Sequence, residues 1–222
     1  MRYLLFDADE TIWDFKATED IGLRKVFSLY DIDYTEETFN AYMEGNLQCW
    51  REYENGTLSL DELETKRWKL FFNKIGRDIS AEKTAELFKD TLAHNGILLP
   101  GAGEFLESIK EYPKSLVTNG ISSIQRQRLK DTGIEHYFEN IFISSEIGYN
   151  KPQKELFDYV FKKVGKTNRE CIMIGDSEHS DIQGAVNAGM ESIYINFRGE
   201  KCNTATWSVS SYSELEALIR RI

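Results

Sequence analysis

The apolar run Tyr3–Phe6 leads directly into two acids, Asp7 and Asp9. Strands buried on both faces, as in a parallel sheet, are continuously apolar, so this run predicts a central parallel strand. Side chains two positions apart in an extended segment point the same way, which places both carboxylates in one pocket beyond the strand. Acids held so close repel unless a cation or a proton separates them, and their oxygens suit Mg²⁺. Taken alone, the stretch is equally typical of a polar turn.

The rest of the chain has two different patterns. Residues 16 to about 95 show helical periodicity, and Ser59-Leu60-Asp61-Glu62 is a capping box that predicts a helix start. From residue 98 onward, apolar runs alternate with helical segments, as in parallel strands joined by right-handed crossovers. We therefore expect an α/β core domain of residues 1–15 and 96–222, with residues 16–95 inserted as an α-helical cap.

The alternating region predicts a Rossmann-like parallel sheet. Four further strands are expected at Lys114–Thr118, Asn140–Ser144, Cys171–Gly175 and Glu191–Asn196, with a possible short strand at Trp207–Val209. Helices are expected at Glu104–Glu111, Ile121–Asp131, Pro152–Val164 and Ser180–Ala188, and after Ser211. A chain of 222 residues exceeds one average domain without reaching two, which agrees with a core that carries an insertion.

Composition excludes several classes of partner. The formal net charge of -10 argues against a nucleic acid polymer or an anionic membrane as partner, because both require a basic face. No apolar stretch approaches the roughly 20 residues of a membrane span. The cysteines Cys49, Cys171 and Cys202 are widely spaced and show no metal-ligand pattern. We expect a cytoplasmic protein, monomer or homodimer, whose partner is a small molecule.

Polar residues of selected types follow the predicted strands. In open α/β sheets ligands bind beyond the carboxyl ends of the strands. Thr118 and Asn119 end one strand, Lys151 lies beyond the next, and Asp176 and Asp181 follow another. Each residue alone has an ordinary structural explanation, such as a helix cap or a solvated lysine. Their joint placement with the first two acids favours a functional site.

These residues resemble a known family. Asp7-x-Asp9-x-Thr11, Thr118, Lys151-Pro152 and Gly175-Asp176-x-x-x-x-Asp181 are similar, in order, to the four motifs of haloacid dehalogenase-like hydrolases. The resemblance implies the strand order 5-4-1-2-3. Within that superfamily, Asp-Ala-Asp-Glu-Thr and the segment from Val117 through Gln125-Arg126-Gln127-Arg128-Leu129 resemble the bacterial pyrimidine 5'-nucleotidase branch. Glu10 departs from the pattern, since many members have glycine there.

The resemblance also implies a mechanism. Asp7 would be the nucleophile that forms an aspartyl phosphate, and Asp9 would protonate the leaving alkoxide and then activate water. Thr118, the Asn119 N–H and Lys151 would bind the phosphoryl oxygens. True dehalogenases expel halide without needing an acid, so the presence of Asp9 disfavours dehalogenation.

The resemblance further implies a metal. Mg²⁺ would be held by the Asp7 carboxylate, the Asp9 backbone carbonyl and Asp176, with Asp181 supporting these ligands from behind. Electrostatics favours the same conclusion, because an anionic nucleophile and an anionic phosphate ester repel each other unless a cation lies between them.

The expected activity is Mg²⁺-dependent hydrolysis of a small phosphate monoester, with a nucleoside 5'-monophosphate as the preferred substrate. A sugar-phosphate phosphatase or a phosphomutase of the same superfamily is the alternative, and a non-catalytic module that binds a phosphorylated ligand is a remote one. Trp13 and Phe15 follow the catalytic acids closely and are the candidates for stacking on a nucleobase. Aromatic residues at helical spacing in the cap are more often core.

Overall fold

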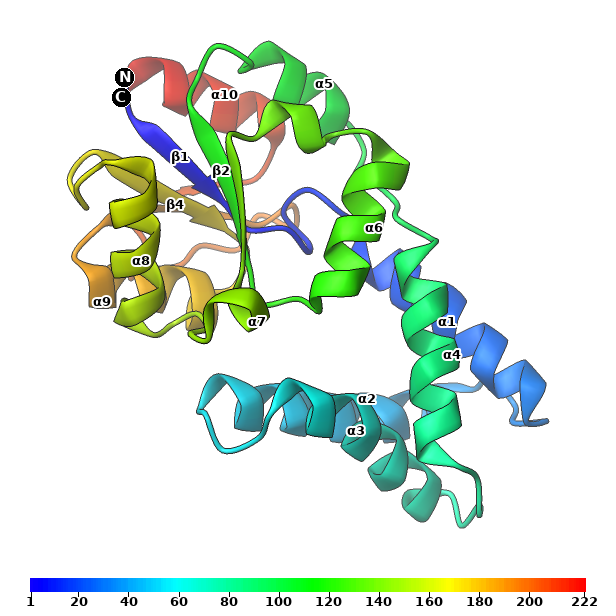
Figure 1. Cartoon of the computed structure of the whole chain (residues 1–222). Coiled ribbons are helices and arrows are strands. Elements are labelled where there is room, and N and C mark those ends of the chain that lie inside the picture. Colours follow the sequence, from blue (N-terminus) through cyan, green and yellow to red (C-terminus); the bar gives the residue numbers. More distant parts are fainter. The chain divides into compact units, whose positions relative to one another are not determined.

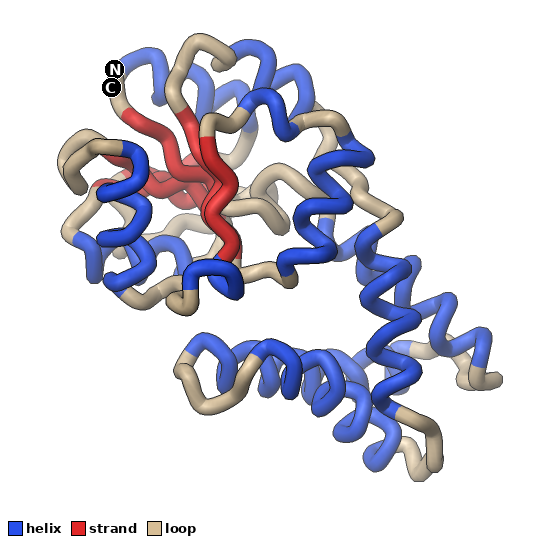
Figure 2. The backbone as a smooth tube through the Cα atoms, viewed as in Figure 1, coloured by secondary structure: helices blue, strands red, loops and turns tan.

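The structure is a computed structural model that describes residues 1–222. The chain divides into two compact units, one made of Met1–Phe15 and Gly96–Ile222 and the other of Lys16–Asn95. All strands belong to the first unit, which we call the α/β unit, whereas the second, the helical unit, contains only helices and loops (Figures 1 and 2). None of the helices combines the length and the apolar character that a membrane span requires.

The α/β unit is organised around one parallel sheet. Its strands are β1 (Tyr3–Phe6), β2 (Lys114–Thr118), β3 (Asn140–Ile143), β4 (Cys171–Gly175), β5 (Glu191–Ile195) and β6 (Trp207–Val209). They lie in the order β3-β2-β1-β4-β5-β6, and every neighbouring pair is parallel. The predicted α/β class and the predicted order of the first five strands are confirmed. The short strand β6 extends the sheet beyond β5.

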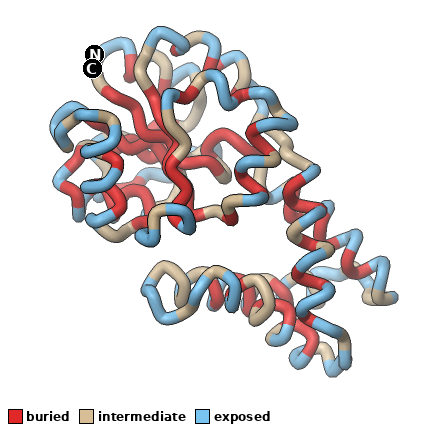
Figure 3. The backbone as a smooth tube through the Cα atoms, in the orientation of Figure 1, coloured by how far each residue is buried: buried red, intermediate tan, exposed pale blue.

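The central strand is buried on both faces, as its continuous apolar character predicts (Figure 3). Leu4 and Phe6 belong to a core with Phe105 and Leu215, which come from α5 (Ala102–Ser108) and α10 (Tyr212–Arg221). The alternate residues Tyr3 and Leu5 pack on the opposite face with side chains of α8 (Lys154–Val164) and α9 (Gln183–Ala188). Helices on both faces leave only the strand ends for polar chemistry.

The expected helices of the α/β unit are present with boundaries shifted by one to three residues, and α5 for example spans Ala102–Ser108 instead of Glu104–Glu111. Helix α6 (Ser122–Thr132) and the short α7 (Ser144–Ile147) follow β2 and β3, and the 3₁₀ turn η1 (Glu135–Tyr137) lies between them. A π-helical turn, η2 (Glu178–Ile182), precedes α9. The expectation that Pro152 starts a helix is wrong, because α8 begins at Lys154. The Lys151–Pro152 peptide bond is cis.

The helical unit contains four helices with an aromatic core. They are α1 (Phe15–Leu29), whose first residue precedes the unit, α2 (Glu36–Glu54), α3 (Leu60–Lys74) and α4 (Ala81–Ala93). The predicted capping box is present at Ser59, whose hydroxyl accepts from the Glu62 N–H while the Glu62 carboxylate accepts from the Ser59 N–H. Phe27 of α1 stacks on Phe71 of α3. Such contacts place most aromatic residues of this unit in its interior.

Candidate active site

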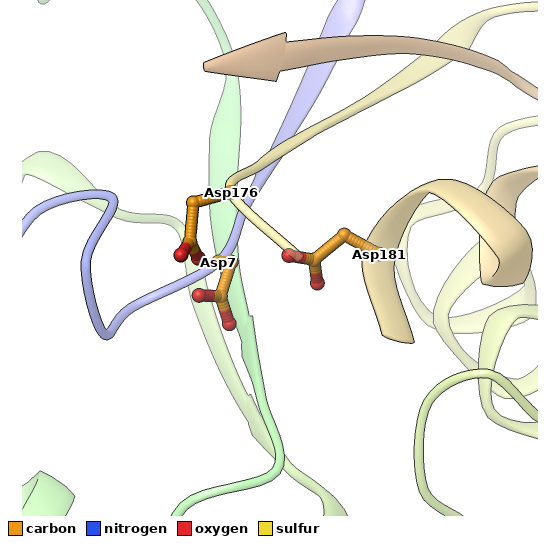
Figure 4. A group of neighbouring side chains, drawn as sticks. All are labelled: Asp7, Asp176 and Asp181. Carbon is orange, nitrogen blue, oxygen red and sulfur yellow. The ribbon is translucent and has the colours of Figure 1, made fainter. Parts of the chain in front are cut away.

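Three acids, of which Asp7 and Asp181 are buried and Asp176 is partly buried, meet at the carboxyl ends of two neighbouring strands (Figure 4). Asp7 follows β1 and Asp176 follows β4, and the pairing of these strands continues through a hydrogen bond from the Asp7 N–H to the Ile174 carbonyl. Asp181 comes from the π-helical turn η2 and points toward the other two. One carboxylate oxygen from each of the three lies within 4.8 Å of the others. A group of hard oxygen donors this compact fits a divalent cation such as Mg²⁺.

Lys151 is the cation among these acids. Its ammonium group is buried, donates to Asp7, and also donates to Asp181 at 2.7 Å. Burial by itself lowers the pKa of Lys151, but the charges of Asp181 and Asp7 outweigh it and raise that pKa above its usual value. Lys151 is therefore charged, and one positive charge faces three carboxyl groups.

Burial and the excess of negative charge raise the pKa values of two of these acids, Asp7 and Asp176. Burial, together with the nearby charge of Asp181, raises the pKa of Asp7 to about 7, although Lys151 acts in the opposite direction. Burial and the charge of Asp7 raise the pKa of Asp176 to about 9. Both acids thus resist ionisation until a further cation is bound. Three carboxylates and one ammonium leave two negative charges, which one Mg²⁺ would balance.

The side chain of Asp181 already accepts hydrogen bonds from two protein groups. It is fully buried, and besides the Lys151 contact its Oδ2 accepts from the Ser177 N–H at 3.0 Å. A Cβ on Gly175 would lie 2.2 Å from this oxygen, so glycine makes room for the carboxylate. These contacts agree with a supporting role behind the metal ligands, which stays a prediction.

The predicted phosphate-binding residues surround the same strand ends. Thr118, the last residue of β2, is buried, and its Oγ1 accepts from the Gly120 N–H at 2.9 Å. The side chain of Asn119 does not face outward but binds the backbone of Lys151, donating to its carbonyl and accepting from its N–H. Asn119 therefore positions Lys151 through its side chain, a role that spacing in the sequence does not reveal.

Asp9 lies beside the cluster but has its own partners. Its Oδ2 accepts from Gln125 at 2.7 Å and its Oδ1 from Arg128 at 2.6 Å. Both partners come from α6, more than a hundred residues further along the chain. The sequence analysis did not identify Gln125 and Arg128 as residues of the site, although their Gln-x-x-Arg spacing places them on one helix face.

A tight turn joins Asp9 to the following residues. The Glu10 N–H donates to the Trp13 carbonyl at 2.7 Å, and Glu10 has a φ of 59°. This left-handed conformation favours glycine, which gives a physical reason for the glycine that many members of the resembled superfamily have at this position. Trp13 is fully buried in the core of the α/β unit, whereas Phe15 is partly exposed. Of the two candidates for nucleobase stacking, only Phe15 thus has exposed surface to offer.

Comparison with known proteins is consistent across sequence and structure. The profile described as haloacid dehalogenase-like hydrolase matches residues 1–189. The chain is 35% identical to the pyrimidine 5'-nucleotidase YjjG of Escherichia coli, over 98% of this chain and 97% of that protein. It is 31% identical to the pyrimidine 5'-nucleotidase PynA of Streptococcus pneumoniae, over 96% and 93% of the two chains.

A solved structure gives the same result for the fold. The crystal structure of the HAD-hydrolase YfnB of Bacillus subtilis, bound to magnesium, superposes with a TM-score of 0.93 and 30% sequence identity. The match covers 99% of this chain and 98% of that one. The likeness therefore extends over both units of the chain.

Proposed function

The chain belongs to the haloacid dehalogenase-like hydrolases and is a phosphoric monoester hydrolase, and we propose that it is a Mg²⁺-dependent nucleotidase that acts on nucleoside 5'-monophosphates. The observation that carries the mechanism is the cluster of Asp7, Asp176, Asp181 and Lys151 at the ends of β1 and β4. It combines a carboxylate nucleophile with donors for a metal and with a fixed ammonium group.

The metal site is proposed from the donor set. The Asp7 and Asp176 carboxylates and the Asp9 backbone carbonyl would hold Mg²⁺, with Asp181 behind them. When bound, Mg²⁺ offsets the repulsion between the anionic nucleophile and the anionic ester and stabilises charge that develops on the phosphoryl oxygens. The excess of acid over base in the cluster, and the raised pKa values of Asp7 and Asp176, support this assignment.

Asp7 and Asp9 carry out different parts of the reaction: nucleophilic attack and proton transfer. In the first half-reaction a carboxylate oxygen of Asp7 attacks phosphorus, the bond from phosphorus to the ester oxygen breaks, and the leaving alkoxide takes a proton from Asp9. In the second half-reaction water attacks the aspartyl phosphate and gives its proton to Asp9, which releases phosphate and restores Asp7. The alkoxide of a nucleoside is a poor leaving group, so the proton from Asp9 matters.

Residues at the neighbouring strand ends are proposed to bind the phosphoryl group that is transferred. The Thr118 hydroxyl, the Asn119 N–H and the Lys151 ammonium are proposed to contact the phosphoryl oxygens. Each well-placed donor of this kind contributes about 3 kcal/mol to transition-state stabilisation. The ion pairs that Lys151 forms with Asp7 and Asp181 hold its ammonium beside the nucleophile, where such a contact is possible.

The substrate class is proposed from the relatives. Two of them, similar over nearly their whole length, are pyrimidine 5'-nucleotidases, which supports a nucleoside 5'-monophosphate here. The core motifs recognise only phosphate and metal, so selectivity for the nucleoside is assigned to the helical unit acting as a cap. Phe15 is the proposed contact with the base from the α/β unit.

The test is Mg²⁺-dependent release of phosphate from a panel of ribo- and deoxyribonucleoside monophosphates, sugar phosphates and phosphoserine. Preference for pyrimidine nucleotides supports the proposal. Preference for sugar phosphates would keep the mechanism but discard the nucleotidase assignment. Asp7→Asn serves as the control for contaminating phosphatases, because it keeps the fold and removes the nucleophile.

A further inference from the structure

Helix α6 carries the segment Gln125-Arg126-Gln127-Arg128, whose four residues fall into two matched pairs. Gln125 and Arg128 are buried on one face of the helix. The other two are at the surface, where Arg126 pairs with Glu146 and Gln127 binds Asp131. One glutamine and one arginine therefore turn inward, and an identical pair turns outward.

The inward pair converges on a single carboxylate, that of Asp9. Gln125 donates to one oxygen at 2.7 Å and Arg128 to the other at 2.6 Å. Separate donors on the two oxygens fix the rotation of the carboxylate plane as well as its position. Gln125 also lies 3.4 Å from the Thr118 hydroxyl, so the same amide connects Asp9 with the proposed phosphate-binding strand end.

The surrounding structure supports this arrangement. The Arg128 side chain is fully buried, and its guanidinium lies 4.8 Å from the centre of the Trp13 ring and 5.7 Å from that of Phe15. Its Nε and Nη2 have no hydrogen-bond partner. A buried guanidinium is costly unless an anion compensates it, and Asp9 is the acid to which Arg128 is paired.

Two glycines make room for the inward pair. A Cβ on Gly120 would lie 2.1 Å from Gln125 Nε2, and a Cβ on Gly96 would lie 3.2 Å from Arg128 Cγ. The first distance is impossible for a real side chain, and the second is tight. The backbone at Gly120 and at Gly96 thus leaves room for Gln125 and Arg128 to reach Asp9.

Building on the proposed phosphatase function, we propose that Gln125 and Arg128 are positioning residues that aim the Asp9 carboxyl group at the ester oxygen of the substrate. Neither residue is proposed to contact the substrate, and both act through the Asp9 carboxyl group that they hold. Each carboxyl oxygen has two lone pairs, so an oxygen that accepts from Gln125 or Arg128 can still hold the proton that Asp9 gives to the alkoxide. Without the pair, Asp9 would rotate away from the geometry that proton transfer requires.

The test compares two leaving groups in the enzyme of residues 1–222. Arg128→Met and Gln125→Leu are assayed with a nucleoside 5'-monophosphate, whose alkoxide needs a proton, and with p-nitrophenyl phosphate, whose nitrophenolate does not. We expect kcat for the nucleotide to fall by about 10²-fold with little change in KM. The first-turnover release of nitrophenolate, which reports attack by Asp7 alone, should stay near the wild-type rate.

The outward pair provides matched controls. Arg126→Met and Gln127→Leu make the same chemical changes on the same helix and should leave both activities unchanged. Thermal unfolding of each variant identifies any that fails to fold. Should Arg128→Met fail to fold, Gln125→Leu decides the matter, because it removes one donor to Asp9 without removing a buried charge.

The outcomes separate this inference from the function on which it rests. An equal loss on both leaving groups in the first turnover, in an active wild-type enzyme, would overturn the positioning role and leave the phosphatase assignment intact. Losses in the control variants as large as those in the inward pair would do the same. A wild-type enzyme that releases phosphate from no ester would overturn the proposed function and this inference together.

Discussion

The side-chain amide of Asn119 forms two hydrogen bonds with the backbone of Lys151, each 2.8 Å long. The amide nitrogen donates to the Lys151 carbonyl, and the amide oxygen accepts from the Lys151 N–H. This reciprocal pair fastens the loop after β2 to the loop before α8. Because Lys151 also reaches Asp7, the position of the ammonium beside the proposed nucleophile depends on a residue that is remote in sequence.

Replacement of this amide should weaken both stability and catalysis. Asn119→Ala leaves two buried backbone groups of Lys151 without partners, which costs about 1–3 kcal/mol. A shift of the ammonium by about 1 Å would lower kcat/KM by roughly 10²-fold. Asn168→Ala is the matched control, since Asn168 also forms two hydrogen bonds to backbone, at Ala188 and Gly189. Urea unfolding and steady-state kinetics should show a stability loss in both variants but an activity loss only in Asn119→Ala.

Asp7→Asn should abolish turnover and leave the fold intact. The amide has nearly the shape of the carboxylate but is not a nucleophile, and loss of a catalytic nucleophile costs on the order of 10⁶-fold in well-studied hydrolases. Asp158→Asn, a change at an exposed residue of α8 that pairs with Lys154, is the control. Near-normal activity in Asp7→Asn, with circular dichroism unchanged, would show that the nucleophile is assigned to the wrong residue.

The raised pKa values of Asp7 and Asp176 predict how Mg²⁺ binding depends on pH. An aspartate that ionises at 3.8 in the unfolded chain has its pKa raised to about 7 at Asp7 and about 9 at Asp176. Between the unfolded and folded values the folded, metal-free protein binds more protons than the unfolded chain, so its stability falls as pH rises. Metal ligation requires both carboxylates to be ionised and therefore releases protons.

We accordingly expect Mg²⁺ to raise Tm by more at pH near 9 than at pH near 6, measured by differential scanning fluorimetry with Mg²⁺ and with chelator. Asp176→Asn should remove most of that pH dependence. An increase in Tm that is the same at both pH values, in the wild type, would contradict the assignment of these two acids as ligands.

The two aromatic residues after Asp9 should behave differently. Trp13 is completely buried, so Trp13→Ala should destabilise the protein by about 3–5 kcal/mol in urea unfolding. It should also lower kcat, since its ring lies against Arg128. Phe15→Ala should instead raise KM for nucleoside monophosphates more than KM for a small phosphate ester. Equal changes in both KM values would remove the proposed contact between Phe15 and the base.

Local patterns in the sequence were sufficient to predict the sheet and to predict which acids form the cluster. The apolar run Tyr3–Phe6 predicts a strand buried on both faces because burial demands apolar side chains at every position. Parallel strands have their carboxyl ends at one edge, so residues such as Asp7 and Asp176 are expected together before any contact is known. The capping box at Ser59 is a local signal of the same kind, since its two hydrogen bonds span only three residues.

The partners of these residues depended on tertiary packing. Asp9 meets Gln125 and Arg128 across more than a hundred residues, and the Asn119 amide turns to the Lys151 backbone instead of to solvent. Likewise, nothing local distinguishes Trp13, which is buried, from the partly exposed Phe15. Strand periodicity and residue type specify which groups reach the sheet edge, whereas the direction of each side chain there depends on which segments pack beside it. That packing pairs Lys151 with Asp7, the proposed nucleophile, and Arg128 with Asp9.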